Sequence, residues 1–293
     1  MITNLLNKTQ KTLSFEVFPP KKEDEFEAAF SIMEKLSALS PDFISVTYGA
    51  GGSRSMKTIE IADYIQNTLH IDALAHMTCV GATKSSIDAV VSEMKKRSLH
   101  NVLALRGDRP QYMTDEQYNS REFEHATDLV SYLHTSNYLH TSNTDMDLCI
   151  AGACYPEKHY EAPDMATDLA YMKQKQECGV SFFISQLFFD NDSFYRFAEL
   201  AEKSGITAPI LPGIMPLTSA KQLNTTVTLS GSSIPKTLAD MIANYGENPD
   251  DMRKAGIDYA INQIRDLKEH DVAGIHIYTM NRPKMTAEIV SSI

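Results

Sequence analysis

The chain has 293 residues, of which 43% are hydrophobic and 22% are charged, and its formal net charge at pH 7 is −11. This balance is typical of a globular protein with a substantial core, and the negative charge argues against a nucleic-acid partner. No run approaches the ~18 apolar residues of a membrane span, and the N-terminus lacks the apolar stretch of a signal peptide. We therefore expect a cytoplasmic protein that binds neither nucleic acid nor membrane.

The four cysteines, Cys79, Cys149, Cys154 and Cys178, form no C-x-x-C pair. Their spacing suggests neither a dense disulfide framework nor a zinc site. We expect reduced, mostly buried thiols and no bound metal.

Strand-like and helix-like segments alternate along the chain. Short apolar runs predict strands at 13–18, 42–47, 72–77, 101–105, 147–153, 181–186, 208–213 and 273–278. Apolar residues at helical spacing predict helices at 26–39, 59–69, 87–94, 124–134, 164–178, 191–204, 219–229, 235–244, 249–269 and 283–292. Eight strands with intervening helices favour a (β/α)8 barrel, the TIM barrel. Because no linker-like stretch interrupts the pattern, we expect one domain over residues 1–293.

A doubly wound open sheet is the alternative fold. Such a sheet usually has fewer strands and a glycine fingerprint directly after the first strand. Here the first predicted strand runs into Pro19, Pro20 and Lys21, which cannot make that turn. The later glycine-rich loop at 48–53 is followed by Arg54, where the fingerprint has its third glycine. The barrel is therefore the preferred prediction.

Nearly every predicted strand ends at a polar or charged residue. These endings include Glu16, Thr47, His76, Arg106-Gly107-Asp108, Gln186 and Asn281-Arg282. A parallel barrel places the carboxyl ends of all its strands on one face, where the active site lies. We therefore expect residues that are far apart in sequence to converge on one pocket.

Glu16 lies among apolar residues in the first predicted strand, LSFEVF at 13–18. A carboxylate in such a place should be paired, hydrated in a pocket or kept protonated by desolvation. A carboxylic acid that keeps its proton near neutral pH is a useful proton donor. The alternative is an outward residue on a half-exposed strand, although parallel barrel strands are covered on both faces.

Other strand ends offer weaker signals. Arg106 and Arg109 can grip a phosphate or a carboxylate, and a turn with an internal ion pair is the alternative. His76 alone is more typical of a satisfied core histidine. Gln186 can fix a heterocyclic substrate through paired hydrogen bonds of its amide. No nucleophile elbow, P-loop or zinc pattern is present.

The hexapeptide YLHTSN occurs twice in succession, at 132–137 and 138–143. Six residues is not a helical repeat, so we interpret the second copy as a tandem insertion between a helix and the fifth strand. Such loops lie on the barrel face opposite the active site. A partner-binding or histidine metal site is the alternative interpretation.

Eight segments of the chain, most of them at predicted strand ends, closely resemble the methylenetetrahydrofolate reductase family. They lie, in order along almost the whole chain, at 14–21, 46–52, 76–79, 105–108, 153–157, 186–190, 212–216 and 278–282. The resemblance implies a (β/α)8 barrel with FAD at its mouth. It also implies hydride transfer from NADH or NADPH to the flavin, and then to 5,10-methylenetetrahydrofolate. The product, 5-methyltetrahydrofolate, serves methionine synthesis.

The resemblance also implies roles for individual residues. FAD contacts are expected at Thr47, His76, Leu105, Arg106, Gly107, Asp108, Ala126, Ala153, Tyr155, His159, Asp168 and Lys175. Folate contacts are expected at Glu16, Gln186, Gln222 and Arg282. Glu16 and Asp108 are the expected catalytic residues: Glu16 is the acid that helps to open the methylene bridge, and Asp108 is a partner of the pterin ring.

Three positions depart from the family pattern. Tyr171 and Gln174 stand where relatives often have Asn and Arg on a FAD-binding helix, and Thr226 stands where an aromatic residue often stacks on the substrate. Two other functions stay open at this point: another flavin-dependent barrel oxidoreductase, and a non-catalytic folate- or flavin-binding barrel. We expect small-molecule substrates and a homo-oligomer.

Overall fold

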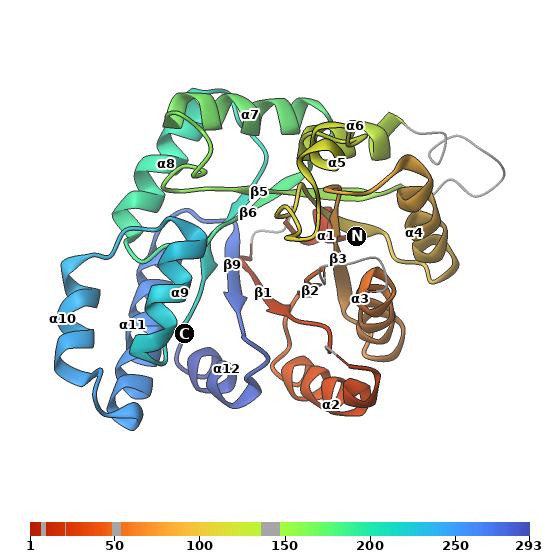
Figure 1. Cartoon of the computed structure of the whole chain (residues 1–293). Helices are drawn as coiled ribbons and strands as arrows, with labels where there is room; N and C mark the ends of the chain where they lie inside the picture. Colours follow the sequence, from red (N-terminus) through yellow and green to blue (C-terminus); the bar gives the residue numbers. More distant parts are fainter. Residues whose placement is uncertain (7–9, 21, 49–53, 136–146) are drawn as a thin grey trace.

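The computed structural model describes residues 1–6, 10–20, 22–48, 54–135 and 147–293. Its strands are parallel and follow one another around a barrel, with helices outside them (Figure 1). The strands are β1 Thr12–Val17, β2 Phe43–Val46, β3 Asp72–Thr78, β4 Asn101–Leu105, β5 Cys149–Cys154, β6 Phe182–Ser185, β7 Ile210–Leu211, β8 Gly213–Ile214 and β9 Gly274–Tyr278. The predicted (β/α)8 barrel is confirmed, and the open-sheet alternative is wrong.

The barrel closes through a strand that is broken in two. β7 pairs with β6, whereas β8, only one residue further along the chain, pairs with β9. The residue between them is Pro212, which has no backbone N–H to donate to a ladder. Its carbonyl still accepts a hydrogen bond from the backbone N–H of His276 at 3.0 Å. The single strand predicted at 208–213 is therefore two short strands in the structure.

The predicted helices are present in the described part of the chain. They are α2 Phe26–Ser37, α3 Arg54–Asp63, α4 Lys84–Lys96, α6 Ala126–Thr135, α7 Met165–Glu177, α8 Asn191–Lys203, α9 Ala220–Ser230, α10 Lys236–Tyr245, α11 Pro249–Glu269 and α12 Pro283–Val290. Two short helices, α1 Ile2–Leu6 and α5 Asp115–Asn119, were not predicted. A π-helical turn, Tyr64–Thr68, continues α3. None of the described helices is long and apolar enough to cross a membrane.

Local sequence sets the starts of several helices near the carboxyl ends of the strands. Asp164, Asp190 and Ser219 each accept a hydrogen bond from a backbone N–H in the first turn of α7, α8 and α9. Such caps satisfy N–H groups that the helix leaves without a partner, typically stabilising it by ~1 kcal/mol.

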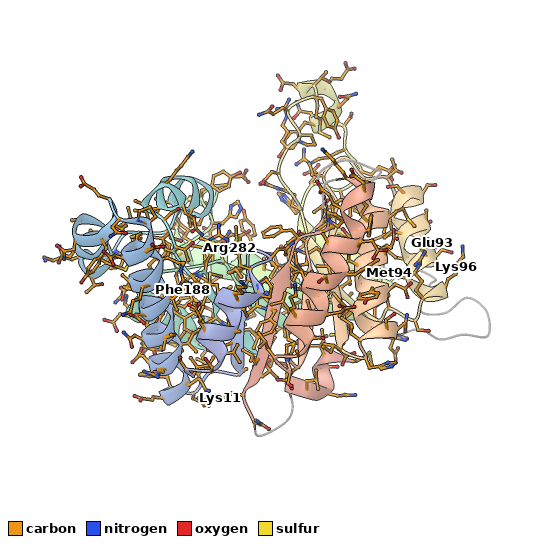
Figure 2. All side chains as sticks on the ribbon, turned by 90° about the horizontal axis from the view of Figure 1, so that it is seen from below. Lys11, Glu93, Met94, Lys96, Phe188 and Arg282 are labelled. Carbon is orange, nitrogen blue, oxygen red and sulfur yellow. The ribbon has the colours of Figure 1, made fainter. Side chains whose placement is uncertain are left out.

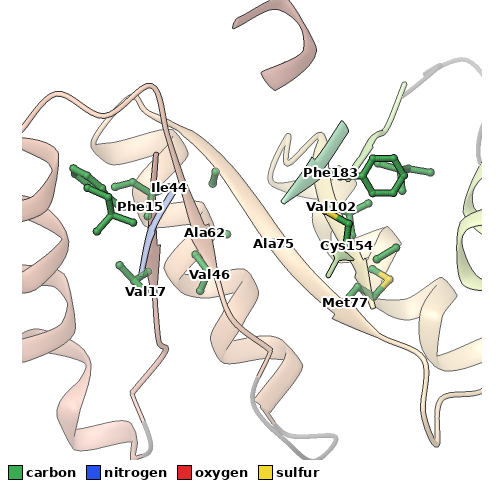
Figure 3. Close-up of a cluster of buried hydrophobic side chains, with 14 of the residues drawn as sticks. Phe15, Val17, Ile44, Val46, Ala62, Ala75, Met77, Val102, Cys154 and Phe183 are labelled. Atoms are coloured by element: carbon green, nitrogen blue, oxygen red, sulfur yellow. The ribbon is translucent and has the colours of Figure 1, made fainter. Parts of the chain in front are cut away.

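Two apolar layers hold the barrel together. Alternate strand residues such as Phe15, Ile44 and Val102 point outward into a buried layer beneath the helices (Figure 3). The intervening residues, such as Phe43 and Phe182, form a second cluster inside the barrel. Both faces of the strands are thus covered, as a parallel barrel requires. Each fully buried large side chain stabilises the fold by roughly 1.5–3 kcal/mol.

Helix α1 closes the amino end of the barrel. Ile2 is fully buried and belongs to the interior cluster, and its backbone N–H donates to the side-chain oxygen of Asn101 at 3.1 Å. In Figure 1, α1 and the N-terminus lie within the ring of helices. With this end filled by side chains, the polar strand ends are left at the opposite, carboxyl end.

Two sequence features lie outside the described residues. These are the glycines of the 48–53 loop and most of the duplicated hexapeptide, because residues 49–53 and 136–146 are not described. Their predicted roles stay predictions.

Candidate active site

The polar strand ends gather at the carboxyl end of the barrel. Figure 2 shows Arg282, which follows β9, well separated from Lys11, which precedes β1 at the other end. Glu16 is the penultimate residue of β1 and pairs in register with Ser45 of β2 and Tyr278 of β9. The predicted convergence on one face is therefore present.

Glu16 is buried, with only 9% of its surface exposed. Its Oε2 atom lies 3.5 Å from Nε2 of His76 and 3.8 Å from Nε2 of His276. We call these three residues the floor cluster. Sequence reasoning predicted Glu16 and His76 but missed His276, although strand alternation places His276 on the same inner face as Ser14 and Glu16 of the neighbouring strand.

Two serine hydroxyls contact the ring nitrogens of His276. The hydroxyl of Ser14 donates to the carbonyl of Ile275 at 3.2 Å and lies 2.8 Å from Nδ1 of His276. The hydroxyl of Ser45 lies 3.4 Å from Nε2 of the same ring, so both ring nitrogens of His276 have a hydroxyl neighbour.

His76 completes the floor cluster as a neutral group. Burial lowers the pKa of His76 to about 4, and nearby Glu16 offsets only part of that effect. Its buried Nε2 atom has no hydrogen-bond partner among the described residues. A buried polar atom without a hydrogen-bond partner costs free energy. A hydrogen bond to a ligand, or to a proton held by Glu16, would therefore stabilise this nitrogen.

The loop after β9 holds the end of β1 in place. The carbonyl of Glu16 accepts hydrogen bonds from the backbone N–H of Thr279 at 3.3 Å and from its hydroxyl at 2.7 Å. The Asn281 amide accepts from the N–H of Phe18 and donates to its carbonyl, each at 2.9 Å. Met280 and Asn281 have left-handed φ values of 53° and 54°, which cost roughly 1–2 kcal/mol per non-glycine residue. The loop that positions the Glu16 backbone therefore contains two residues in an energetically unfavourable backbone conformation.

A groove of about 1110 Å³ is lined by the ends of β2, β3 and β4 and by helices α3, α4 and α5, and His76 is the member of the floor cluster that lines it. Five predicted FAD residues line it: Thr47, His76, Leu105, Gly107 and Asp108. Gly107 has a φ of +82°, and a Cβ atom there would lie 2.9 Å from Thr78. Only glycine suits this turn. Asp108 beside it is exposed at the groove wall.

A second group of predicted FAD residues lies at the end of β5, in the loop after it and on α7. Hydrogen bonds connect α7 to the other two segments. The backbone N–H of His159 donates to Asp168 at 2.9 Å, and Nζ of Lys175 donates to the carbonyl of Ala153 at 3.0 Å. The ring of Tyr155 meets that of His159 edge to face at 4.6 Å. Burial lowers the pKa of Lys175 and raises that of Tyr155. Ala126, another predicted FAD residue, is the first residue of α6.

Arg106 forms an ion pair with a residue outside its own turn, unlike the internal ion pair that the sequence left as an alternative. Its guanidinium donates to both carboxylate oxygens of Glu161, with Nη2 at 2.9 Å from Oε1. The hydrogen bond from Arg106 lowers the pKa of Glu161 to about 2, and the pair raises the pKa of Arg106. Glu161 was not predicted. Its place two residues after His159, a predicted FAD contact, is the sequence signal it offers.

Two of the four predicted folate residues, Gln222 and Arg282, belong to a less buried network. Nη1 of Arg282 donates to the hydroxyl of Thr218 at 2.6 Å, and that hydroxyl lies 3.3 Å from Oε1 of Gln222. We call these three residues the rim network; sequence reasoning missed Thr218. Gln186 lies apart from it in the hydrogen-bond pattern, and its Oε1 accepts from the backbone N–H of Leu187 at 2.9 Å.

The three departures from the family pattern lie on α7 and α9. Tyr171 and Gln174 are exposed on α7, whereas Thr226 of α9 is 6% exposed. A buried threonine presents little surface on which a ring could stack. Within the described ranges, no group of three histidine, cysteine, aspartate or glutamate residues is arranged to hold a metal ion.

A family model described as methylenetetrahydrofolate reductase matches residues 1–293, the whole chain. The chain belongs to the methylenetetrahydrofolate reductase family. The resemblance drawn from the strand ends is thus confirmed for the whole chain, while the roles of single residues stay predictions.

Individual members of the methylenetetrahydrofolate reductase family agree. Methylenetetrahydrofolate reductase (NADH) 1 of Arabidopsis thaliana is 33% identical over 301 residues, covering 100% of this chain and 50% of the plant protein. The 5,10-methylenetetrahydrofolate reductase of Pectobacterium carotovorum subsp. carotovorum is 31% identical over 281 residues, covering 96% of this chain and 89% of that protein. The chain spans about half the length of the plant relative and most of the bacterial one.

A solved structure has the same fold. It is an uncharacterized protein from Clostridium thermocellum that binds two copies of 5-methyl-5,6,7,8-tetrahydrofolic acid. It superposes with a TM-score of 0.64 at 16% identity, covering 99% of this chain and 96% of that chain. At this identity the likeness concerns the barrel fold alone.

Proposed function

We propose that this chain reduces 5,10-methylenetetrahydrofolate to 5-methyltetrahydrofolate with electrons from NADH or NADPH, and so supplies methyl groups for methionine synthesis. The observation that carries the proposal is the buried carboxylate of Glu16 at the mouth of a barrel of this family. The names of the plant and bacterial relatives support the same reaction. The folate bound by the Clostridium thermocellum barrel supports the substrate class.

The residues at the mouth fit FAD as the cofactor. The groove volume of about 1110 Å³ suits a dinucleotide. Gly107 would allow the cofactor to approach the backbone closely. The buried Nε2 atom of His76 has no hydrogen-bond partner among the described residues and could bond to the cofactor. Thr47, His76, Leu105, Gly107 and Asp108 would hold FAD from the groove, and Arg106, Ala126, Ala153, Tyr155, His159, Asp168 and Lys175 from the β4, α6 and β5 side. Bound FAD supplies a hydride carrier between the nicotinamide and the folate.

Glu16 acts in the folate half of the cycle. The methylene bridge of the substrate opens when its bond to N10 breaks, and N10 leaves far more readily when it is protonated. Glu16 donates that proton directly or through one water. The opened bridge is an electrophilic iminium carbon that accepts a hydride. Hydride transfer from the nicotinamide needs no such acid.

Other residues orient the reactants and set the local field. Gln186 can pair with the donor and acceptor edge of the pterin through its amide. Asp108, exposed at the groove wall, would place a carboxylate near the pterin and the cofactor. Arg282 has further N–H donors beyond the one bound to Thr218, and they can bind a substrate carboxylate.

The visible absorption spectrum of the purified protein tests this function. We expect a flavin spectrum that is bleached by NADH or NADPH and restored by methylenetetrahydrofolate. Bleaching without restoration would favour another flavin-dependent oxidoreductase on this barrel. Binding of flavin or folate without any turnover would favour a non-catalytic barrel.

A further inference from the structure

Thr218 lies between Gln222 and Arg282, two residues that the family resemblance predicts to contact the folate. It follows β8 and precedes α9, and only 7% of its surface is exposed. Its hydroxyl oxygen lies 2.6 Å from Nη1 of Arg282 and 3.3 Å from Oε1 of Gln222. Its backbone N–H also donates to Oε1 of Gln222, at 3.1 Å. One buried residue therefore contacts both predicted ligands.

The direction of these hydrogen bonds is fixed by chemistry. A guanidinium can only donate, so the Thr218 oxygen accepts from Arg282. The Thr218 proton then points to Oε1 of Gln222, which can only accept. The other end of the amide, Nε2 of Gln222, donates to the carbonyl of Pro216 at 3.3 Å. The network therefore fixes both the orientation of the Gln222 amide and one edge of the Arg282 guanidinium.

The loop that carries Thr218 is backed by helix α11. A Cβ atom on Gly256 would lie 1.7 Å from the carbonyl oxygen of Leu217, so the helix backbone packs directly against this loop. Ser219, the next residue, caps α9 and accepts a hydrogen bond from the backbone N–H of Gln222. Thr218 is thus held from both sides and offers Arg282 a stationary acceptor.

We propose that Thr218 is a positioning residue for folate binding: its hydroxyl aims the guanidinium of Arg282 and the amide of Gln222 at the substrate. This inference rests on the proposed function. A guanidinium tethered through Nη1 keeps Nε and Nη2 for bidentate contact with a carboxylate, an arrangement that loses less entropy on binding than a free side chain.

Three variants of the full-length protein test the role of the hydroxyl. Thr218→Val keeps the side-chain shape and removes the hydroxyl, whereas Thr218→Ser keeps the hydroxyl. Thr12→Val is the matched control, because Thr12 is 3% exposed at the amino end of β1 and its hydroxyl has no hydrogen-bond partner among the described residues. The readouts are KM and kcat for methylenetetrahydrofolate, and the rate of flavin reduction by NADH.

We expect Thr218→Val to raise the KM for methylenetetrahydrofolate roughly 10-fold, the usual effect of losing a hydrogen bond to a charged group. Its kcat and its rate of flavin reduction by NADH should stay within about two-fold of wild type. Thr218→Ser should restore the KM to within about three-fold, and Thr12→Val should leave it unchanged. This split separates positioning from a general loss of structure, which would slow both halves of the cycle.

Unchanged KM in Thr218→Val, with normal folate turnover in the wild type, would overturn this inference alone. Equal slowing of both half-reactions, or failure of serine to restore the KM, would also overturn it. A wild-type protein that is reduced by NADH but neither binds nor turns over the folate would overturn the proposed function, and this inference with it.

Discussion

The floor cluster and the rim network are built in opposite ways. Glu16, His76 and His276 of the floor cluster project from barrel strands and are nearly or fully buried. Thr218, Gln222 and Arg282 of the rim network lie on a loop, a helix and a helix start, and Arg282 is exposed. The first group has few hydrogen bonds to its reactive atoms, whereas the second is joined by direct hydrogen bonds.

This difference separates chemistry from recognition. A buried carboxylate with histidine nitrogens at 3.5 and 3.8 Å can hold or release a proton in a medium that strengthens electrostatic effects. An exposed arginine in a polar network can bind a charged group reversibly. Changes at the floor should therefore alter rates of proton-dependent steps, and changes at the rim should alter affinity.

The largest effect is expected at Glu16. Glu16→Gln keeps the shape and hydrogen bonding of the side chain but cannot transfer a proton. We expect steady-state turnover with methylenetetrahydrofolate to fall by roughly 10²–10⁴, the usual contribution of a positioned general acid. Glu16→Asp, which retains an acid one methylene further away, should lose less. Equal turnover of the glutamine variant and the wild type would contradict the claim that the floor cluster, unlike the rim network, sets the rate of a proton-dependent step.

Substitution of Asp108 tests whether the groove wall influences the chemistry of the reaction, as we expect of the floor cluster. Its negative charge should disfavour an anionic reduced flavin, so Asp108→Asn should raise the flavin reduction potential, by an energy of order 1 kcal/mol. Folate reduction should be impaired at the same time. Redox titration against a reference dye measures the potential. A variant with full FAD content and an unchanged potential would show that Asp108 has no electrostatic role.

His76 links the floor cluster to stability in acid. Its pKa is lowered by burial to about 4 in the folded state, against an ordinary value of 6.5, so the unfolded chain binds the proton first as the pH falls. The free energy of unfolding should therefore decrease between about pH 6.5 and 4, by an amount of order 1–3 kcal/mol.

Urea unfolding of the flavin-free protein at several pH values measures this effect. His76→Gln should show a smaller decrease than the wild type. Some pH dependence should remain, because burial also lowers the pKa of His159. The same slope in both proteins would contradict the assignment to His76.

The smallest effect is expected from the duplicated hexapeptide. Residues 138–143 belong to neither the floor cluster nor the rim network and lie outside the described residues. We predict that their deletion leaves steady-state turnover nearly unchanged, because doubling a loop costs only ~0.6 kcal/mol in closure entropy. A folded deletion variant with a large loss of turnover would place the insertion at the active site.

The barrel could be predicted because its strands are local apolar runs with polar endings. The break at Pro212 could also be foreseen in principle, since proline cannot donate to a ladder. The closing role of Ile2 could not, because a five-residue helix has too few turns to show periodicity. Its burial depends on the barrel around it.

The site was predicted where a strand end carries a chemically distinctive group, as at Glu16 and His76. His276, Glu161 and Thr218 were missed for a common physical reason. Each acts through a partner that is distant in the chain: 260 positions separate Glu16 and His276, 55 separate Arg106 and Glu161, and 64 separate Thr218 and Arg282. Such pairs follow from tertiary packing, and the residue types alone have ordinary structural uses.

The most direct test of the floor as the acid site is stopped-flow absorbance of the flavin in Glu16→Gln, with each half of the cycle measured separately. We predict that reduction by NADH stays within a few-fold of wild type, while reoxidation by methylenetetrahydrofolate slows by roughly 10²–10⁴. Equal slowing of both halves would make Glu16 a structural residue, and unchanged reoxidation would assign the acid to another group.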